Sequence, residues 1–306
     1  MTERTDSLRR VTFALAKGAM AGVAWGEESR APDIVFLHAT GLNALAYRTL
    51  LAPLAERFHV LALDLRGHGR TALPARTFGY TSWTVHRNDV IELIDKHIRA
   101  RVTLAGHSMG ATTALLVAGK RPDLVRGLAL IEPVILPPAR IEGFQLPLAP
   151  LFARWTSPIA RGAARRRARF VSREAAFAAL KGRGFFNAFP DAALQDYLTD
   201  GLVDEDESVR LACSPKYEAA TFSAHRHDPW RALPRAPKAL VLVRAEKEST
   251  CPAPIAARVK AMRPDARIAM IEGASHALPM ERPDRARAAI ETAHLMATGG
   301  AFIDPE

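Results

Sequence analysis

One serine, flanked by glycines and set between an apolar run and a helical segment, constrains this chain more than any other feature. Residues 106–110 follow the pattern G-x-S-x-G, with Ser108 at the centre. The apolar run 101–105 predicts a strand, and residues 111–118 predict a helix. A strand, a tight turn and a helix in this order are typical of a nucleophile elbow, whose glycines accommodate a strained serine backbone. We therefore expect the hydroxyl of Ser108 beside a helix N-terminus, which favours a developing anion.

Short apolar runs alternate with helical segments along most of the chain. This alternation predicts an α/β fold, with a mostly parallel sheet covered by helices on both faces. The predicted strands are 11–16, 22–25, 33–37, 60–63, 102–105, 128–131, 239–243 and 267–271, and the predicted helices besides that at 111–118 are 47–57, 84–98, 255–262 and 283–296.

The alternation stops between residues 134 and 230. This region is rich in Pro, Arg and Ala, and no strand pattern is evident in it. We expect a helical cap at 134–230, over a core formed by 1–133 and 231–306. Its aromatic residues would mostly pack on the core, with some left to line an acyl or aryl pocket. They are Phe144, Phe152, Trp155, Phe170, Phe177, Phe185, Phe186 and Phe189.

Composition narrows the classes of protein that this chain can represent. Two cysteines among 306 residues do not make a disulfide framework, which favours a reducing, cytoplasmic location. We expect neither a signal peptide nor a membrane span.

The formal net charge of +10 raises the question of a nucleic-acid partner. The densest basic cluster lacks interleaved aromatic residues, so a solvated helix face is favoured over specific nucleic-acid binding. The oligomeric state stays open. The basic cluster comprises Arg161, Arg165, Arg166, Arg167 and Arg169.

A serine hydroxyl needs a base and an orienting acid before it can attack a carbonyl. His276 is the candidate base, because it follows the last predicted strand on a loop at the carboxyl end of the sheet. Two candidate acids also follow predicted strands, Glu248 after 239–243 and Glu132 after 128–131. We favour Glu248 slightly and keep Glu132 as the alternative.

Acyl transfer also needs donors for the oxyanion of the tetrahedral intermediate. The backbone N–H of Met109, next to the serine, is one candidate. The turn 38–41 after an early predicted strand supplies the other, for which we select the N–H of Thr40. His225 and His227 carry a spacing found in metal sites, but they are better explained as a junction between cap and core, and we expect no metal ion.

Five motifs in order give the chain a family resemblance. Beside the elbow they are His38-Ala39-Thr40-Gly41, Asp64-Leu65-Arg66-Gly67-His68-Gly69, the acid loop 244–248 and the histidine loop 273–276. Together they resemble the α/β-hydrolase fold superfamily, in particular its cap-bearing serine esterases with epoxide-hydrolase-like architecture. The resemblance implies a mostly parallel eight-stranded sheet and a helical cap.

The chain departs from the family pattern at three positions. Ala39 and Ala245 replace glycines, and the acid is Glu where Asp is usual. In this resemblance, Ser108 in place of the Asp of epoxide hydrolases implies acyl transfer.

We therefore predict a carboxylesterase that acts on a small hydrophobic ester through an acyl-enzyme, without cofactor or metal. The alternatives with the same residues are a hydrolase of carbon–carbon bonds in β-diketone-type substrates, a lactonase, a haloperoxidase-like enzyme and an acyltransferase. A further alternative is a catalytically inactive ligand-binding protein of the same fold.

Overall fold

A computed structural model describes residues 8–28, 30–146, 149 and 156–300 of the chain. An eight-stranded sheet runs through its centre in the order β1-β2-β4-β3-β5-β6-β10-β11. The β1–β2 and β2–β4 pairs are antiparallel, and the other five pairs are parallel. The predicted fold class is confirmed. The strands are β1 (Arg9–Leu15), β2 (Gly18–Trp25), β3 (Ile34–Leu37), β4 (Val60–Leu63), β5 (Val102–His107), β6 (Val125–Ile131), β10 (Ala239–Ala245) and β11 (Arg267–Ile271).

The parallel strands are apolar throughout because both faces of the sheet are buried. Successive residues of β3 point to opposite faces, so that Ile34 and Phe36 enter one hydrophobic core and Val35 and Leu37 enter the other. All four side chains are fully buried. The continuous apolar runs in the sequence were therefore a sound basis for predicting these strands.

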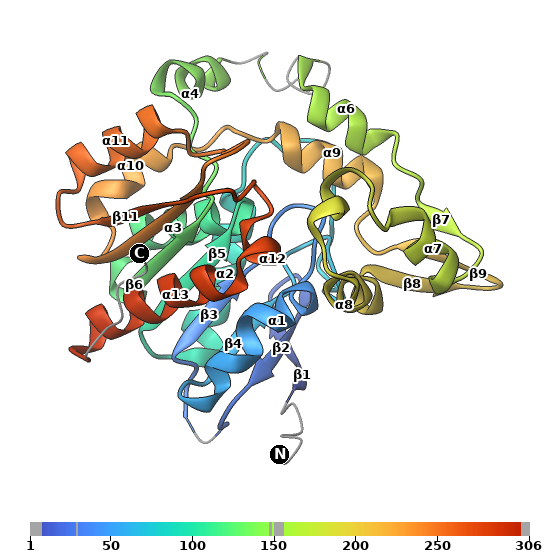
Figure 1. The fold of residues 1–306 in the computed structure, drawn as a ribbon, viewed down its shortest axis with the longest axis horizontal. Helices are drawn as coiled ribbons and strands as arrows, with labels where there is room; N and C mark the ends of the chain where they lie inside the picture. Colours follow the sequence, from blue (N-terminus) through green and yellow to red (C-terminus); the bar gives the residue numbers. More distant parts are fainter. Residues whose placement is uncertain (1–7, 29, 147–148, 150–155, 301–306) are drawn as a thin grey trace.

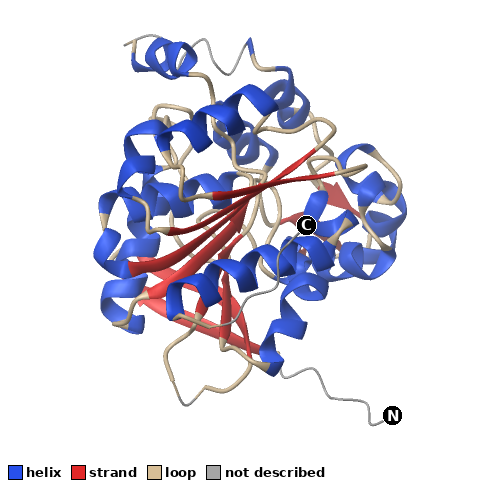
Figure 2. Cartoon of the chain, turned by 60° about the vertical axis from the view of Figure 1, so that its left-hand side comes forward, coloured by secondary structure: helices blue, strands red, loops and turns tan. Residues whose placement is uncertain are grey.

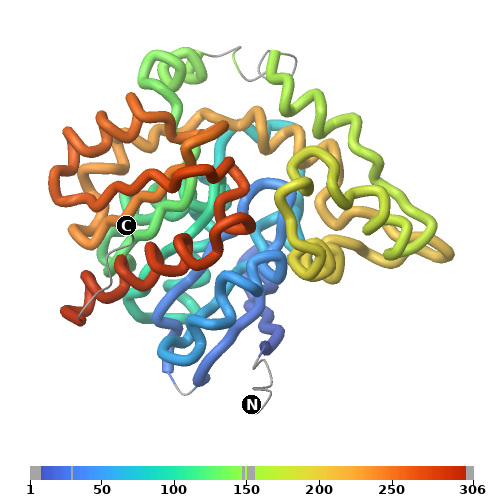
Figure 3. The backbone as a smooth tube through the Cα atoms, viewed as in Figure 1, coloured from blue at the N-terminus to red at the C-terminus, as the bar shows by residue number. Residues whose placement is uncertain are grey.

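Helices cover both faces of the sheet (Figures 1 and 2). On one face α3 packs on β5 and β6, with α2 and α10 beside it. On the other face α13 packs on β6 and β10 and lies along α1, which the tube view of Figure 3 shows as red beside blue. The core helices are α1 (Arg48–Leu51), α2 (Thr84–Leu93), α3 (Met109–Lys120), α10 (Pro229–Ala232), α11 (Ala253–Met262), α12 (Leu278–Glu281) and α13 (Pro283–Thr298).

Short helical turns lengthen or link these helices and strands. The segment 47–57, expected as one helix, is divided into η1, α1 and η2, and Pro53 stands in the first turn of η2. Proline lacks the N–H that would continue the preceding helix. The turns are η1 (Leu45–Tyr47), η2 (Ala52–Glu56), η3 (Ile94–Ile98), η4 (Pro122–Leu124) and η6 (Leu233–Arg235).

Between β6 and α10 the chain leaves the large sheet and forms an insertion (residues 134–228), which is coloured green to light orange in Figure 1. The expectation of an insertion without strands is wrong, because a second sheet of order β7-β9-β8 lies within it. Phe152 and Trp155 lie outside the described residues. The insertion contains α4 (Pro138–Gln145), α6 (Pro158–Ala164), β7 (Arg169–Phe170), α7 (Arg173–Leu180), η5 (Gly184–Ala188), α8 (Asp191–Gly201), β8 (Leu202–Glu205), β9 (Ser208–Leu211) and α9 (Pro215–Ser223).

Among the described residues, no helix combines the length and the apolar character that crossing a membrane requires.

The turn after β4 is held by buried charged groups. Asp64 accepts hydrogen bonds from the backbone N–H groups of Ala44 and Arg70. Arg66 donates to both carboxylate oxygens of Asp89 on α2, at 2.6 and 2.8 Å, and neither side chain is more than 8% exposed. These bonds connect the turn after β4 to the loop after β3 and to α2.

The Arg66–Asp89 pair provides a test of this arrangement. Replacing Asp89 by Ala leaves a buried guanidinium without its partner, so the free energy of unfolding should fall by about 3–5 kcal/mol. Urea denaturation followed by circular dichroism measures the change. The matched control is Asp95→Ala, which removes an exposed partner of Arg121 and should leave the midpoint near that of the wild type. Equal midpoints for both variants would contradict a structural role for the buried pair.

Candidate active site

Ser108 stands between β5 and α3 with a backbone that few residues other than glycine adopt. Its φ and ψ are 54° and −117°. Its N–H donates to the carbonyl of Ile131, at the end of the neighbouring strand β6, at 3.0 Å. The predicted elbow is therefore present in geometry as well as in sequence.

The two glycines of the elbow permit a close approach of backbone segments. A Cβ at Gly106 would overlap Gly110, and a Cβ at Gly110 would overlap the carbonyl of Leu37 at the end of β3. The first turn of α3 is thus pressed against the neighbouring strand, which leaves the serine at the rim of the sheet.

Three side chains from three strand ends form one hydrogen-bonded chain. The Oγ of Ser108 lies 3.0 Å from Nε2 of His276, and Nδ1 of His276 lies 2.9 Å from Oε2 of Glu132. Glu132 directly follows β6, and His276 lies between β11 and α12. Parallel strands bring their carboxyl ends to one edge, which is why residues 144 or more positions apart meet here.

The structure reverses the order of the two candidate acids. Glu132 is fully buried and contacts His276, whereas Glu248 is exposed on the loop after β10. That loop instead holds the buried carboxylate: Ser249 Oγ donates to Glu132 at 2.6 Å and the Thr250 N–H donates at 3.1 Å. The loop after β10 wraps over the residue after β6 because these two strands are neighbours.

The turn after β3 brings Thr40 against the elbow. Its side-chain hydroxyl lies 3.4 Å from the sulfur of Met109. In the part of the chain that the structure describes, the backbone N–H groups of Thr40 and Met109 donate to no protein acceptor. Two free amides therefore stand on adjacent segments beside Ser108, as an oxyanion hole requires.

Two buried histidines join the turn after β3 to the turn after β4. The Gly41 N–H donates to Nε2 of His68 at 3.0 Å, and the Leu65 N–H donates to Nε2 of His38 at 2.9 Å. Burial lowers the pKa of His68 to about 4 and also lowers the pKa of His38. Both rings are neutral at pH 7 and can accept these bonds.

His107 and Tyr47 lie near the site but were not predicted from the sequence. His107 occupies the variable position before Ser108, and its Nε2 lies 2.8 Å from the backbone carbonyl of His276. Tyr47 lies 2.8 Å from the other ring nitrogen of His107. The one available signal was a histidine next to the serine at the end of a buried strand, where a polar side chain needs a partner.

The insertion contributes one aromatic ring to the surroundings of His276. Phe185 on η5 lies 6.2 Å from the His276 ring, between centroids, and is 39% exposed. Phe170, Phe186 and Phe189 are buried in the core that the insertion shares with the sheet. Phe144 lies against the ring of His225.

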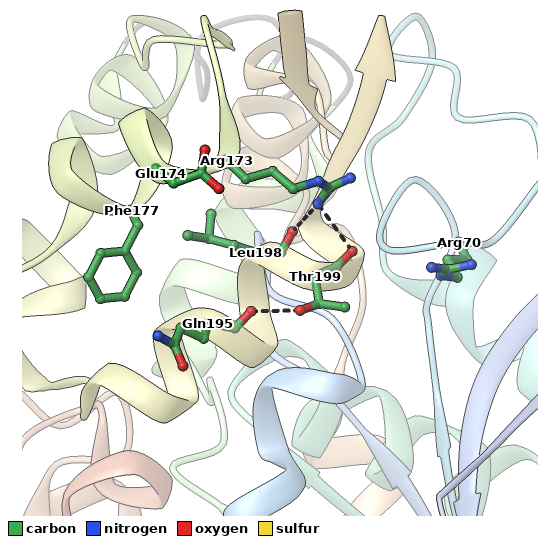
Figure 4. A pocket seen from close by; sticks show the side chains of 7 residues that line it. All are labelled: Arg70, Arg173, Glu174, Phe177, Gln195, Leu198 and Thr199. Atoms are coloured by element: carbon green, nitrogen blue, oxygen red, sulfur yellow. Dashed lines mark hydrogen bonds between the residues drawn. The ribbon is translucent and has the colours of Figure 1, made fainter.

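Two cavities lie away from these groups. A cavity of about 540 Å³ opens between α7, α8 and Arg70, and Figure 4 shows its lining, which includes Phe177. A second cavity of about 420 Å³ shares Arg70 and Arg173 with it. Neither lining includes Ser108, Glu132 or His276.

His225 and His227 lie where the insertion returns to the core. Both rings pack on the indole of Trp83, at 5.2 and 4.7 Å between centroids. The residues described contain no group of three potential metal ligands.

A sheet of this order, an elbow serine after β5, a histidine after the last strand and a carboxylate after an intervening strand define a hydrolase-type site on an α/β fold. The comparisons agree with this class. A model of the alpha/beta hydrolase family matches residues 34–289, so the chain belongs to that family.

Among the curated relatives is the 2-(acetamidomethylene)succinate hydrolase of Mesorhizobium japonicum, 28% identical over 250 residues, which cover 82% of this chain and 83% of the relative. An esterase of Mycobacterium tuberculosis is 33% identical over 115 residues, which cover 38% and 37%. The crystal structure of an E-2-(acetamidomethylene)succinate hydrolase superposes with a TM-score of 0.74 at 24% identity and covers 94% of this chain and 98% of that one.

The depressed pKa of His68 gives a pH-dependent contribution to stability. Between pH 6.5 and about 4, His68 binds a proton in the unfolded chain but not in the folded chain, so the free energy of unfolding falls as the pH is lowered through this window. His68 alone should lower the free energy of unfolding by about 1.4 kcal/mol per pH unit. His68→Gln retains an acceptor for Gly41 and removes the titration. Urea denaturation from pH 4 to 7 should show a shallower decline for the variant, and parallel curves would contradict the assignment.

Proposed function

We propose that the chain is a serine hydrolase of carboxylic esters, a carboxylesterase that works through an acyl-enzyme. The observation that carries the proposal is the continuous hydrogen-bonded chain from Ser108 through His276 to Glu132. The two free amides beside the serine support it, because they can stabilise the negative charge that forms when the serine attacks a carbonyl.

The reaction proceeds in two halves. Ser108 Oγ attacks the ester carbonyl while Nε2 of His276 takes its proton, and the oxyanion is bound by the N–H groups of Thr40 and Met109. His276 then gives the proton to the departing alcohol, leaving an acyl group on the serine. Water deprotonated by the same nitrogen attacks this acyl group, and the acid is released. Glu132 holds the Nδ1–H of His276 and stabilises the imidazolium.

Residues 134–230 act in this proposal as a cap that bounds the substrate. Phe185 supports this role, because it places an apolar ring from the insertion near the base. Ser108 is 6% exposed, so little solvent reaches the nucleophile. A small hydrophobic ester fits such a site.

The relative from Mesorhizobium favours a second candidate, hydrolysis of an acetamido-substituted dicarboxylate, the kind of compound that its name describes. The charge around the oxyanion turn bears on this choice. The carboxylate of Glu218 abuts Gly41 and is paired with Arg166 at 2.6 Å. Since the pair brings no net positive charge to the turn, we place a neutral ester first.

The two candidate acids can be separated by matched substitutions. Glu132→Gln keeps the shape but loses the charge that stabilises protonated His276, so kcat for p-nitrophenyl butyrate should fall about 10³- to 10⁴-fold. Glu248→Gln, with the same chemical change on an exposed loop, should stay within two-fold of the wild type. Initial rates over a range of ester concentrations measure both.

Chemical labelling provides the control for the nucleophile. A fluorophosphonate should modify the wild-type chain at Ser108 and leave Ser108→Ala unlabelled, as read by mass spectrometry of peptides. Absence of both turnover and labelling in the folded wild-type chain would refute the enzyme and favour a ligand-binding protein. Turnover of an acetamido dicarboxylate above that of neutral esters would favour the second candidate.

A further inference from the structure

A buried line of hydrogen bonds connects the three loops of the site. The Ala39 N–H lies 3.1 Å from the hydroxyl of Tyr47, which lies 2.8 Å from Nδ1 of His107. The Nε2 of His107 lies 2.8 Å from the carbonyl oxygen of His276. The line therefore begins in the oxyanion turn, passes through the elbow and ends on the backbone of the base.

The chemistry of the partners determines each donor. A carbonyl oxygen only accepts, so Nε2 of His107 carries the hydrogen. In the neutral ring Nδ1 is then an acceptor, and the Tyr47 hydroxyl must donate to it. The hydroxyl oxygen in turn accepts from Ala39. No other assignment satisfies every group, so the line has one direction from end to end.

Burial keeps both side chains in the required state. Tyr47 and His107 are fully buried. Burial lowers the pKa of His107, whose ring therefore stays neutral, and burial raises the pKa of Tyr47, which stays protonated. In such surroundings a polar group that loses its hydrogen-bond partner is left without water to replace it, so the line resists distortion.

The positions of the ends matter because each adjoins a reacting group. Ala39 precedes the Thr40 amide, His107 precedes Ser108, and the carbonyl at the far end belongs to His276 itself. The carboxylate of Glu132 holds the ring of His276 through Nδ1. The bond from His107 acts on a different part of the same residue, because it joins the main-chain carbonyl of His276 to the end of β5 beside the elbow, and the two rings lie 5.0 Å apart between centroids.

We propose that Tyr47 and His107 are positioning residues, which set the separation of Ser108 and His276 and hold the Thr40 amide toward the oxyanion. The proposal rests on the ester hydrolysis proposed above. Neither side chain touches the reacting atoms, so their loss should lower kcat and the rate of serine labelling while KM changes little.

Two substitutions at one position separate the two halves of the line. His107→Asn retains an acceptor near the place of Nδ1 and loses the reach to His276. His107→Gln retains a donor near the place of Nε2 and loses the acceptor for Tyr47. We expect kcat to fall about 10- to 100-fold in His107→Asn, as a displacement near 1 Å would produce, and only a few-fold in His107→Gln. KM should stay within two-fold in both.

The remaining variants test the coupling and the specificity of the effect. Tyr47→Phe should lower kcat, and combining it with His107→Asn should cost less than the product of the two separate losses, because both cut one line. His294→Asn is the matched control, since this buried histidine pairs with Thr103 on the far side of the core. It should leave kcat unchanged. Equal losses in His294→Asn and His107→Asn would reduce the effect to general destabilisation and overturn the proposal.

A spectroscopic readout tests the line without any substrate. Nitrogen-15 spectra of the histidine side chains should show His107 protonated at Nε2 alone at pH 7, and His107→Asn should shift the His276 signals while His294→Asn does not. If the wild-type chain hydrolyses no ester and is not labelled, the proposed function fails. These spectra still test the line of hydrogen bonds in that case. A proton on Nδ1 of His107, or unchanged His276 signals in His107→Asn, would overturn it.

Discussion

The backbone of Ser108 is the constraint on which the rest of the site depends. A non-glycine residue at φ 54° and ψ −117° costs about 1–3 kcal/mol, and it persists only where its surroundings leave no other choice. Those surroundings are Leu37 at the end of β3, against which Gly110 is pressed, and Ile131 at the end of β6, which accepts the serine N–H. The pairing of β3, β5 and β6 therefore maintains the strained backbone. Side chains of these strands are buried in both hydrophobic cores, so the packing of the cores supports it as well.

Much of this arrangement could be predicted from the sequence, because its signals are local. Buried parallel strands are continuous apolar runs, and the elbow, the histidine loop and the oxyanion turn are short motifs next to them. The strands of the insertion could not be predicted. β7 has two residues, and β8 and β9 have four each with charged side chains among them, so they carry no apolar period that separates them from a loop.

The choice between the two acids failed for a different reason. Glu132 and Glu248 each follow a strand, and those strands, β6 and β10, are neighbours, so position along the chain does not distinguish them. What distinguishes them is the fold of the second loop. Ser249 and Thr250 turn inward to donate to Glu132, and a carboxylate with that many donors can be buried, whereas Glu248 remains in solvent. The hydrogen bonds that stabilise the buried carboxylate come from residues 117 and 118 positions away. They arise only when the two loops pack together, so the sequence around Glu132 carries no pattern that indicates them.

The buried histidines explain how loops from different strands keep a common geometry. A neutral imidazole presents one donor and one acceptor at fixed separation, so a single ring can join an amide on one loop to a carbonyl on another. His68 joins Gly41 to the turn after β4, and His107 joins Tyr47 to the loop of His276. A lysine or carboxylate would bring a charge that burial penalises, and a serine would not span the gap. The cost is sensitivity to acid, because protonation removes the acceptor. A site assembled from neutral rings therefore keeps its geometry only while its surroundings exclude water and protons. The position of the nucleophile consequently depends on the packing of the core beneath it.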